Sequence, residues 1–220
     1  MKAMILAAGR GERMRPLTDT MPKPLLKAGG KPLIQYHIEA LRDAGIRELV
    51  INHAHLGALL VEYLGSGERL GVCICYSAEP EGALETGGGI RHALPLLGEH
   101  PFIVVNGDIW TDYPYQQLRR TPAGLVHLVL VDNPEHNPAG DFSLEGDSVT
   151  DAGAHKLTFS GIGLYHPDLF AAAPDGAFPL APLLRSAMQE GQVSGEYYPG
   201  QWMDIGSPQR LGELDRKLRA

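Results

Sequence analysis

Short apolar runs alternate with amphipathic stretches along the first half of the chain. Four runs have the length and composition of buried strands: residues 4–7, 49–52, 72–76 and 102–105. Three stretches between them have the apolar spacing of helices: residues 33–44, a segment that ends near residue 64, and residues 88–96. Strands without a polar face that alternate with helices are typical of a parallel sheet covered by helices on both sides.

The second half of the chain is less regular. The pattern predicts strands at residues 125–131, 159–165 and 193–198, a short hairpin at 142–149 and a helix at 180–190. Ser207 followed by Pro208 marks the start of a C-terminal helix, because a capping residue before proline is a common helix beginning. Residues 132–140 hold two prolines and two asparagines and are predicted to form a mobile loop. No linker or repeat divides the chain, so we expect residues 1–220 to form a single domain.

The net charge of the chain and the length of its apolar runs argue against nucleic-acid and membrane partners. The chain has 19 basic and 26 acidic residues and a net charge of -7, the opposite of the basic surface that nucleic acids or anionic membranes require. The opening apolar run is too short for a signal peptide, and no run reaches the roughly 20 residues of a membrane span. We therefore expect a cytoplasmic monomer or homodimer with no nucleic-acid or membrane partner.

Cys73 and Cys75 lie two residues apart on a predicted strand. Their side chains then point to the same face, but the short tether prevents an unstrained disulfide. No further thiolate or histidine nearby completes a metal site of the usual spacing. Both cysteines are predicted to be reduced and buried in the strand packing, where free cysteine is usually found.

A glycine-rich loop follows the first predicted strand. Gly9 and Gly11 match the first two glycines of a dinucleotide-binding fingerprint, but Met14 occupies the third position, which argues against a NAD-linked dehydrogenase. The phosphate-binding loop of ATPases is also missing from the sequence. A basic segment stiffened by prolines comes next, with Arg13 near its start and Lys23 between two prolines. These features predict a phosphate-binding loop of another kind.

Residues 6–25 resemble the opening of the sugar-1-phosphate nucleotidyltransferases. That family's pattern reads Leu-Ala-Ala-Gly-x-Gly-x-Arg-Met-x-Pro-Leu-Thr and then Pro-Lys-Pro-Leu. The resemblance implies a three-layer α/β/α sandwich of the nucleotide-diphospho-sugar transferase type, built around a mixed, mostly parallel sheet. It also implies an enzyme that moves a nucleoside monophosphate from an NTP onto a sugar 1-phosphate and releases pyrophosphate.

The same resemblance assigns roles within this opening. The glycine loop would bind the triphosphate through Leu6, Ala8, Gly9, Gly11 and Arg13. Arg13 would stabilise the departing pyrophosphate. Lys23 would draw two repelling phosphates together as a point charge, so Lys23 and Arg13 are the catalytic candidates.

Two aspartates are candidate metal ligands. Asp108 follows a buried strand in Asn106-Gly107-Asp108, and Asp204 lies in Trp202-Met203-Asp204-Ile205-Gly206. Taken alone, an aspartate after a strand, such as Asp108, is more often a turn or cap residue, and for Asp204 a cap or a solvated acid is the alternative. The resemblance implies that the two carboxylates bind Mg²⁺ together, a hard cation that prefers oxygen ligands.

The segment around Glu85 bears on the choice of substrates. Many relatives read Leu-Gly-Thr-Ala-Gly where this chain has Leu84-Glu85-Thr86-Gly87-Gly88, so Glu85 departs from the family pattern. This variant resembles the N-acetylmuramate 1-phosphate uridylyltransferases of cell-wall recycling, which implies UTP and N-acetylmuramic acid 1-phosphate as substrates. Guanylyltransferases acting on mannose or heptose 1-phosphate stay open as an alternative, because Glu79 could accept hydrogen bonds from guanine. A non-catalytic sensor of nucleotide sugars is a further alternative.

Several other residues are candidates for the substrate pocket. On the nucleotide side these are Glu79, Gly82, Thr86 and Asn106. On the sugar side they are Glu85, Gly87, Asn137, Gly161 and His53. His53 ends a buried strand, so a structural role is equally in keeping with its position.

Overall fold

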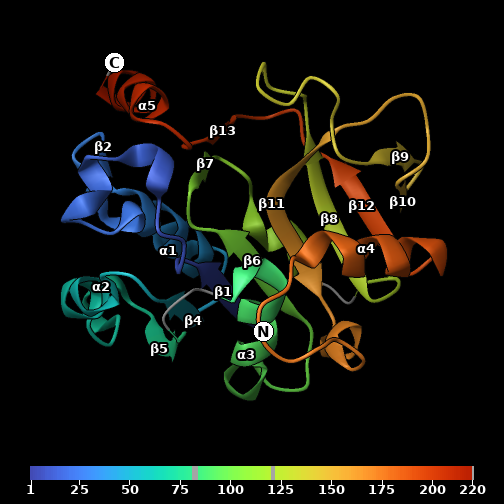
Figure 1. Ribbon diagram of the computed structural model, residues 1–220, viewed down its shortest axis with the longest axis horizontal. Helices are drawn as coiled ribbons and strands as arrows, with labels where there is room; N and C mark the ends of the chain where they lie inside the picture. Colours follow the sequence, from blue (N-terminus) through green and yellow to red (C-terminus); the bar gives the residue numbers. More distant parts are fainter. Residues whose placement is uncertain (81–83, 120–121, 220) are drawn as a thin grey trace.

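A computed structural model describes residues 1–80, 84–119 and 122–219 of the chain. Nine strands form the central sheet, in the spatial order β5-β4-β1-β6-β11-β8-β12-β10-β9 (Figure 1). Their bounds in chain order are β1 (Lys2–Leu6), β4 (Glu48–His53), β5 (Cys73–Ala78), β6 (Phe102–Asn106), β8 (Val126–Val131), β9 (Ser143–Glu145), β10 (Ser148–Thr150), β11 (Thr158–Tyr165) and β12 (Val193–Tyr197). The pairings make β10 and β11 run against the other strands of this sheet, which is therefore mixed and mostly parallel.

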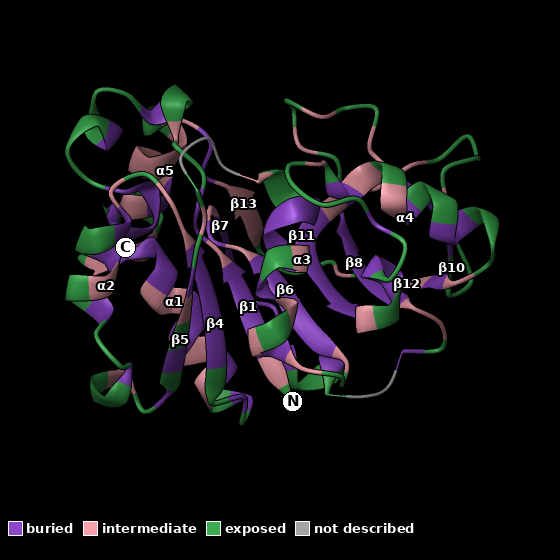
Figure 2. Ribbon diagram, turned by 60° about the horizontal axis from the view of Figure 1, so that its bottom comes forward, coloured by how far each residue is buried: buried purple, intermediate pink, exposed green. Residues whose placement is uncertain are grey.

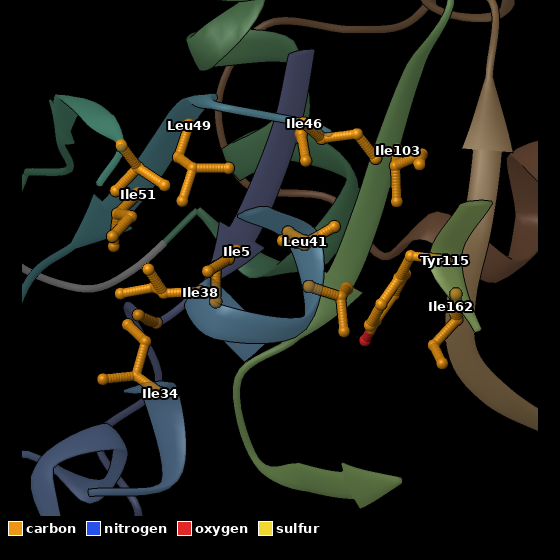
Figure 3. Close-up of a cluster of buried hydrophobic side chains, with 14 of the residues drawn as sticks. Ile5, Ile34, Ile38, Leu41, Ile46, Leu49, Ile51, Ile103, Tyr115 and Ile162 are labelled. Carbon is orange, nitrogen blue, oxygen red and sulfur yellow. The ribbon is translucent and has the colours of Figure 1, made fainter. Parts of the chain in front are cut away.

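Helices cover both faces of the sheet, as the alternating pattern predicts. They are α1 (Leu33–Asp43), α2 (Gly57–Leu64), α3 (Glu85–Leu97), α4 (Leu180–Gln189) and α5 (Pro208–Arg219). Alternate residues of one strand serve the two faces: Ile5 of β1 packs in the cluster that holds α1 and α2 (Figure 3), whereas Met4 packs in the cluster that holds α3 and α4. Figure 2 shows the central strands buried between these layers. The three-layer α/β/α sandwich is confirmed.

The C-terminal helix α5 lies against the N-terminal part of the chain (Figure 1). A third buried cluster includes Met14, Leu33 and Leu214, and the N–H of Gly29 donates a 2.8 Å hydrogen bond to the carboxylate of Asp215. The hairpin β2 (Lys27–Ala28) and β3 (Lys31–Pro32) forms the part that α5 covers. The end of the chain therefore closes over the segment that follows the glycine loop.

The predicted elements are present, with two differences that matter for the site. Helix α3 begins at Glu85, three residues before the predicted start. The short strands β7 (Ile109–Thr111) and β13 (Trp202–Asp204) pair with each other, and the sequence pattern does not predict them. Three-residue strands are too short to show a period, so their pairing is visible only in three dimensions.

The burial predicted for the cysteines was wrong. Cys73 and Cys75 are free thiols on β5, and both side chains are exposed. Strand β5 is the edge of the sheet, and the intervening Ile74 is the residue that faces the core. In the described part of the chain, no helix has both the length and the apolar character needed to cross a membrane.

Candidate active site

A cavity of about 360 Å³ opens at the carboxyl ends of β1 and β6, the edge of a parallel sheet where ligands usually bind. It brings together most of the residues predicted for the nucleotide and the reacting phosphates, together with Glu85 from the predicted sugar side: Leu6, Ala8, Gly9, Gly11, Arg13, Lys23, Glu79, Glu85, Thr86, Asn106 and Asp108. Gly206, two residues after Asp204, also lines it. Residues far apart in the sequence thus meet around one space.

The glycine loop needs glycine for two different reasons. Gly11 has a φ of +67°, and a β-carbon there would come within 2.9 Å of Cγ2 of Thr18. The hydroxyl of Thr18 donates a 2.8 Å hydrogen bond to the carbonyl of Gly11 and fixes this turn. Gly9 has no atom within 4 Å of its β-carbon position, so its backbone is open toward the cavity. The loop presents bare backbone that a phosphate can approach closely.

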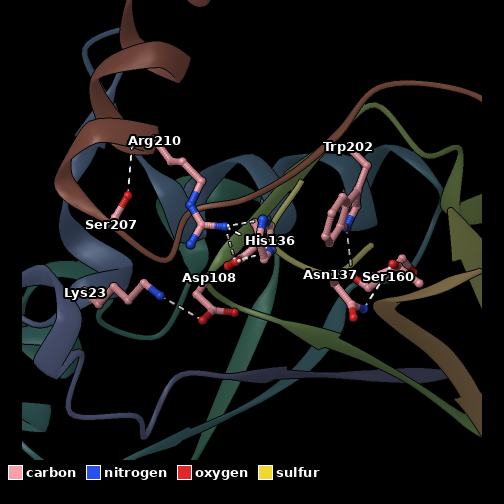
Figure 4. A network of polar contacts seen from close by, with 10 residues as sticks. Lys23, Asp108, His136, Asn137, Ser160, Trp202, Ser207 and Arg210 are labelled. Carbon is pink, nitrogen blue, oxygen red and sulfur yellow. Dashed lines mark hydrogen bonds and ion pairs between the residues drawn. The ribbon is translucent and has the colours of Figure 1, made fainter. Parts of the chain in front are cut away.

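Lys23 is nearly buried, with an exposed fraction of 7%. It begins a single turn of 3-10 helix, and the prolines on either side restrict its backbone. Its Nζ donates a 2.8 Å hydrogen bond to Oδ2 of Asp108, 85 residues away in the sequence (Figure 4). A lysine is seldom buried without such a partner. The pair fixes a positive charge in the wall of the cavity.

Asp204 comes close to Asp108 through the pairing of β13 with β7. In this antiparallel pair Asp204 lies opposite Ile109, the residue that follows Asp108. The N–H of Ile205 donates a 2.8 Å hydrogen bond to the carbonyl of Asp108. The two carboxylates therefore project from neighbouring backbone positions, although 96 residues separate them in the chain.

Both carboxylates have cationic partners. Oδ2 of Asp204 accepts a 2.6 Å hydrogen bond from Nη1 of Arg210 and lies 3.2 Å from Nε2 of His136. Two adjacent carboxylates that each attract a cation suit a hard divalent metal, which prefers oxygen ligands. Among the described residues, no group of three or more His, Cys, Asp or Glu side chains could hold a metal. Substrate oxygens and water would have to complete the coordination shell.

A buried histidine supports the Asp108 turn from behind. His37 of α1 is 2% exposed, and burial lowers its pKa to about 4. Its Nε2 lies 2.8 Å from the carbonyl of Ile109, so it donates to that oxygen. Its Nδ1, 3.2 Å from the hydroxyl of Tyr115, is then the acceptor. Neutral His37 therefore ties α1 to the start of β7, beside Asp108.

Both oxygens of the Glu79 carboxylate are occupied by donors within the protein. Oε1 accepts a 2.6 Å hydrogen bond from the side-chain amide of Asn52, and Oε2 accepts a 2.8 Å bond from the N–H of Leu84. Asn52 in turn accepts a 2.8 Å bond from the N–H of Ala7 in the phosphate-binding segment. Glu79 thus joins the end of β5 to the start of α3 and, through Asn52, to the end of β1.

The glycines of α3 serve packing. A β-carbon on Gly87 would lie 2.4 Å from the ring of Phe178, and one on Gly88 would lie 2.3 Å from the carbonyl of Gly176. Gly87 is buried against Phe178 and is not among the described residues that line the cavity, so its place in the sugar site stays a prediction. Glu85 does line the cavity, with a φ of +57°. Gly82 lies outside the described residues.

His53 is placed for a structural role. A β-carbon on Gly57 would lie 2.1 Å from Nδ1 of His53, so the ring fits directly over the start of α2. The other side meets the ring of Tyr76 edge to face, with centroids 5.9 Å apart. His53 is not among the described residues that line the cavity, which favours the structural alternative.

Asn137 and Gly161 lie near Asn106 and the strand that carries Asp204. Gly161 has a φ of +80°, and a β-carbon there would lie 2.6 Å from the amide nitrogen of Asn106. The side chain of Asn137 donates a 3.2 Å hydrogen bond to the hydroxyl of Thr158 and so ties down the loop of residues 132–140. Figure 4 shows Asn137 beside Ser160, below the side chain of Trp202.

Four residues of the site were not predicted: His37, Asn52, His136 and Arg210. Asn52 ends a predicted strand beside the cavity, a position that could have marked it. The contacts of His37 with Ile109 and of Arg210 with His136 join residues more than 70 positions apart. No local pattern carries such information.

Comparison with known proteins agrees with this geometry. A family model described as nucleotidyl transferase matches residues 2–142. The chain is 54% identical to the N-acetylmuramate alpha-1-phosphate uridylyltransferase of Neisseria meningitidis, over 97% of this chain and 96% of that protein. It is 32% identical to the mannose-1-phosphate guanylyltransferase catalytic subunit beta of Danio rerio, over 94% of this chain and 62% of that protein.

Solved structures show the same fold. HddC from Yersinia pseudotuberculosis, complexed with GMP-PN, superposes with a TM-score of 0.80 at 20% sequence identity. The match covers 98% of each chain. The arrangement of the sheet and its helices is therefore shared at low sequence identity.

Proposed function

The chain belongs to the nucleotidyl transferase family and is a sugar-1-phosphate nucleotidyltransferase, and from this we propose that it transfers a uridylyl group from UTP to N-acetylmuramic acid 1-phosphate. The observation that carries the reaction class is the meeting of Lys23, Asp108 and Asp204 beside a glycine loop with exposed backbone. The 54% identity to a uridylyltransferase over almost the whole length supports the choice of substrates. The product would be a nucleotide sugar formed during cell-wall recycling in the cytoplasm.

The reaction is a direct displacement at the α-phosphorus of UTP. A phosphate oxygen of the acceptor sugar forms the new bond to that phosphorus, and the bond to the oxygen that bridges the α- and β-phosphates breaks. Pyrophosphate leaves with this electron pair. Lys23 offsets the charge of two phosphates brought together, and Arg13 binds the phosphates that depart. No protein nucleophile takes part.

Asp108 and Asp204 would hold Mg²⁺. Asp108 directly precedes β7 and Asp204 ends β13, its partner strand, and each carboxylate already pairs with a cationic side chain of the protein. Mg²⁺ usually binds one or two carboxylates together with substrate phosphates. When bound, it neutralises charge on the phosphate oxygens during displacement.

The contacts of Glu79 support uracil over guanine. A guanine reader would use the carboxylate as an acceptor for two N–H groups. Here each Glu79 oxygen already accepts a bond from Asn52 or Leu84. Each oxygen keeps a second lone pair, but turning the carboxylate to face two N–H groups of guanine would break the contacts with Asn52 and Leu84, which costs binding energy. The backbone around Glu79 and Thr86 is then the proposed contact surface for the base.

The acceptor would lie on the side of the second half of the sheet. Gly161 packs against Asn106, and Asn137 bonds to Thr158 of the same strand, β11, so that bare backbone and an amide group are available there. Glu85 lines the cavity with no hydrogen bond or ion pair to another described residue, so its carboxylate is open to a sugar hydroxyl or amide. We assign Asn137, Gly161 and Glu85 to the acceptor and keep Asn106 on the nucleotide side.

A panel of substrates tests the proposal. The purified protein is given each of the four NTPs with N-acetylmuramic acid, mannose, heptose and glucose 1-phosphates, and pyrophosphate release is measured. We expect UTP with N-acetylmuramic acid 1-phosphate to give the highest kcat/KM. A higher value for GTP with mannose or heptose 1-phosphate would reject the substrates and keep the reaction class. Binding of nucleotide sugar without turnover of any pair would reject the enzyme assignment.

A further inference from the structure

The carboxylate of Asp204 is already engaged by an arginine from the C-terminal helix. Nη1 of Arg210 lies 2.6 Å from Oδ2 of Asp204, and the two side chains are 20% and 17% exposed. His136, from the loop of residues 132–140, lies 3.2 Å from the same oxygen. Figure 4 shows Arg210 reaching from α5 toward His136, above Asp108 and Lys23. The ion pair thus occupies the carboxylate that we assign to the metal.

A second guanidinium approaches the same place. A β-carbon built on Gly206 would lie 2.5 Å from Nη2 of Arg210, 3.0 Å from Oδ2 of Asp204 and 3.3 Å from Nη1 of Arg13. Gly206 and Arg13 both line the cavity. Two guanidinium groups repel each other unless an anion lies with them, and in the protein alone Asp204 is that anion. Because Gly206 has no side chain, both guanidinium groups and the carboxylate of Asp204 can lie close together.

We propose that Arg210 exchanges partners during the reaction and becomes a phosphate-binding residue. In the substrate-free protein it neutralises Asp204. Once Asp204 takes up the metal, the guanidinium of Arg210 turns to a phosphate at the reacting centre, alongside Arg13. This inference rests on the proposed function, since it needs a metal at Asp204 and phosphates in the cavity.

Charge and reach favour this exchange. The oxygen of Asp204 that contacts Arg210 would become a metal ligand, so a cation beside it loses its anionic partner and meets a second positive charge. A guanidinium presents several N–H donors in a planar fork that matches phosphate oxygens. Its long side chain needs only a rotation to leave the carboxylate. The phosphate belongs either to UTP or to the acceptor sugar, and Arg210 stands between Arg13 of the glycine loop and His136 of the second half.

Metal binding without substrates gives the first test. Mn²⁺ replaces Mg²⁺ as the probe, and its binding to the substrate-free protein is titrated by electron paramagnetic resonance. In Arg210→Met the competing cation is lost, so we expect Mn²⁺ to bind about 5-fold more tightly. The matched control is Arg219→Met on the same helix. Nε of Arg219 lies 2.9 Å from Oδ2 of Asp215, and neither residue is among the described residues that line the cavity. We expect wild-type Mn²⁺ affinity in this control.

Steady-state kinetics give the second test. In Arg210→Met we expect the KM of one substrate to rise about 10-fold, because a charge-assisted hydrogen bond to phosphate is lost. A rise for UTP identifies the triphosphate as the source of the phosphate, and a rise for the sugar 1-phosphate identifies the acceptor. Arg210→Lys keeps the ion pair with Asp204 but not the fork. It should show wild-type Mn²⁺ affinity and a smaller rise of the same KM.

Several results would overturn the inference. Unchanged or weaker Mn²⁺ binding in Arg210→Met would show that the arginine does not compete with the metal. Tighter Mn²⁺ binding with both KM values unchanged would remove the phosphate role. If Arg210→Met does not fold, as judged by thermal unfolding, wild-type KM values in Arg210→Lys would likewise remove the phosphate role. A wild-type protein that turns over no substrate pair rejects the proposed function instead, while the Mn²⁺ titration still decides the competition at Asp204.

Discussion

The two halves of the central sheet contribute to the site in different ways. In the first half, β5, β4, β1 and β6 run parallel, and their carboxyl ends meet at one edge. The residues directly after these strands supply the glycine loop, Glu79 and Asp108. In the second half, β11, β8, β12, β10 and β9 are mixed in direction. On this side, the site residues lie at the bulge of β11, in the loop of residues 132–140 and on β13, a strand outside this sheet.

This difference shows what topology alone can place. Parallel strands bring every strand end to the same edge, so a ligand site follows from the order of the strands. The second half has no such rule, and each residue depends on a specific long-range contact. Asp204 relies on the pairing of β13 with β7, Gly161 on an irregular register between β11 and β8, and His136 on its contacts with Asp204 and Arg210.

The largest expected effect tests whether the halves form one site. Asp108→Asn and Asp204→Asn each replace a hard anionic ligand by a neutral amide oxygen, and we expect each to lower kcat by on the order of 1000-fold. Pyrophosphate release at increasing Mg²⁺ concentration measures both. Asp175→Asn is the control, because the Asp175 side chain is 98% exposed and is not among the described residues that line the cavity. Full activity in either variant would remove that residue from the metal site and show that its half of the sheet does not contribute a metal ligand.

The next effect concerns the first half alone. Lys23→Ala removes a fixed positive charge from the reacting phosphates, and we expect kcat to fall by on the order of 100-fold while the fold stays intact. The loss to stability is small because the Asp108 side chain left unpaired is 40% exposed. Thermal unfolding and single-turnover rates measure the two quantities. Lys27→Ala, an exposed lysine four residues along, is the matched control. Turnover near the wild-type rate would refute a catalytic role for Lys23.

The same contrast explains how far the sequence could be read. The apolar runs located the strands and helices of the first half, because each run is long enough to show its period. The contiguous segment of residues 6–25 carried the phosphate loop and Lys23 together, and the strand end carried Asp108. Asp204 could be assigned only through the resemblance, since nothing local in Trp202-Met203-Asp204 says that it meets Asp108.

Some residues have contacts that the sequence does not predict, for physical reasons. Gly87 and Gly88 read as a ligand turn, because a run of small residues leaves space in either case. In the protein that space is filled by Phe178 and Gly176, from the connection between β11 and α4. The cysteines of β5 read as buried, because the sequence of a strand does not say whether it lies at the edge of its sheet. Arg210 lies on the polar surface of α5, where an arginine needs no explanation until Asp204 is placed beside it.

A moderate effect is expected at His37, which ties α1 to the start of β7 beside Asp108. Burial lowers its pKa from 6.5 to about 4 in the folded protein, so the unfolded chain takes up a proton at a higher pH than the folded one. Stability is then full above pH 7 and is lost as the pH falls from about 6.5 toward 4. From this group alone we expect the free energy of unfolding to be about 2 kcal/mol lower at pH 5 than at pH 7.5.

Chemical denaturation across this pH range measures the effect of His37. The matched variant is His37→Gln, whose amide can donate to Ile109 and accept from Tyr115 but does not titrate. It should lose about 2 kcal/mol of the pH dependence, whatever its stability at neutral pH. An unchanged difference between pH 5 and pH 7.5 in this variant would mean that His37 is not held neutral behind the Asp108 turn.

The smallest expected effect compares two strained positions within the first half. Among the described residues, Leu56 and Glu85 are the non-glycine residues with positive φ, at 55° and 57°. Such a backbone costs a residue with a side chain about 1 kcal/mol. Glu85 lines the cavity where many relatives have glycine, whereas Leu56 is half-buried at the start of α2 and is not among the described cavity residues. Strain that persists at a site is expected where the side chain serves function.

Glycine substitutions at Leu56 and Glu85 separate strain from function. Glu85→Gly removes an exposed side chain and relieves the backbone, so we expect it to raise the free energy of unfolding by about 1 kcal/mol. Because the carboxylate facing the acceptor is lost, kcat/KM for the sugar 1-phosphate should fall by about 10-fold. Leu56→Gly relieves the same strain but gives up apolar packing, so its gain in stability should be smaller, with kcat/KM unchanged. Thermal unfolding and steady-state kinetics on the two variants provide both values. If Glu85→Gly is more stable and keeps the wild-type kcat/KM, the carboxylate has no part in binding the acceptor, and the strain at Glu85 has the same standing as that at Leu56.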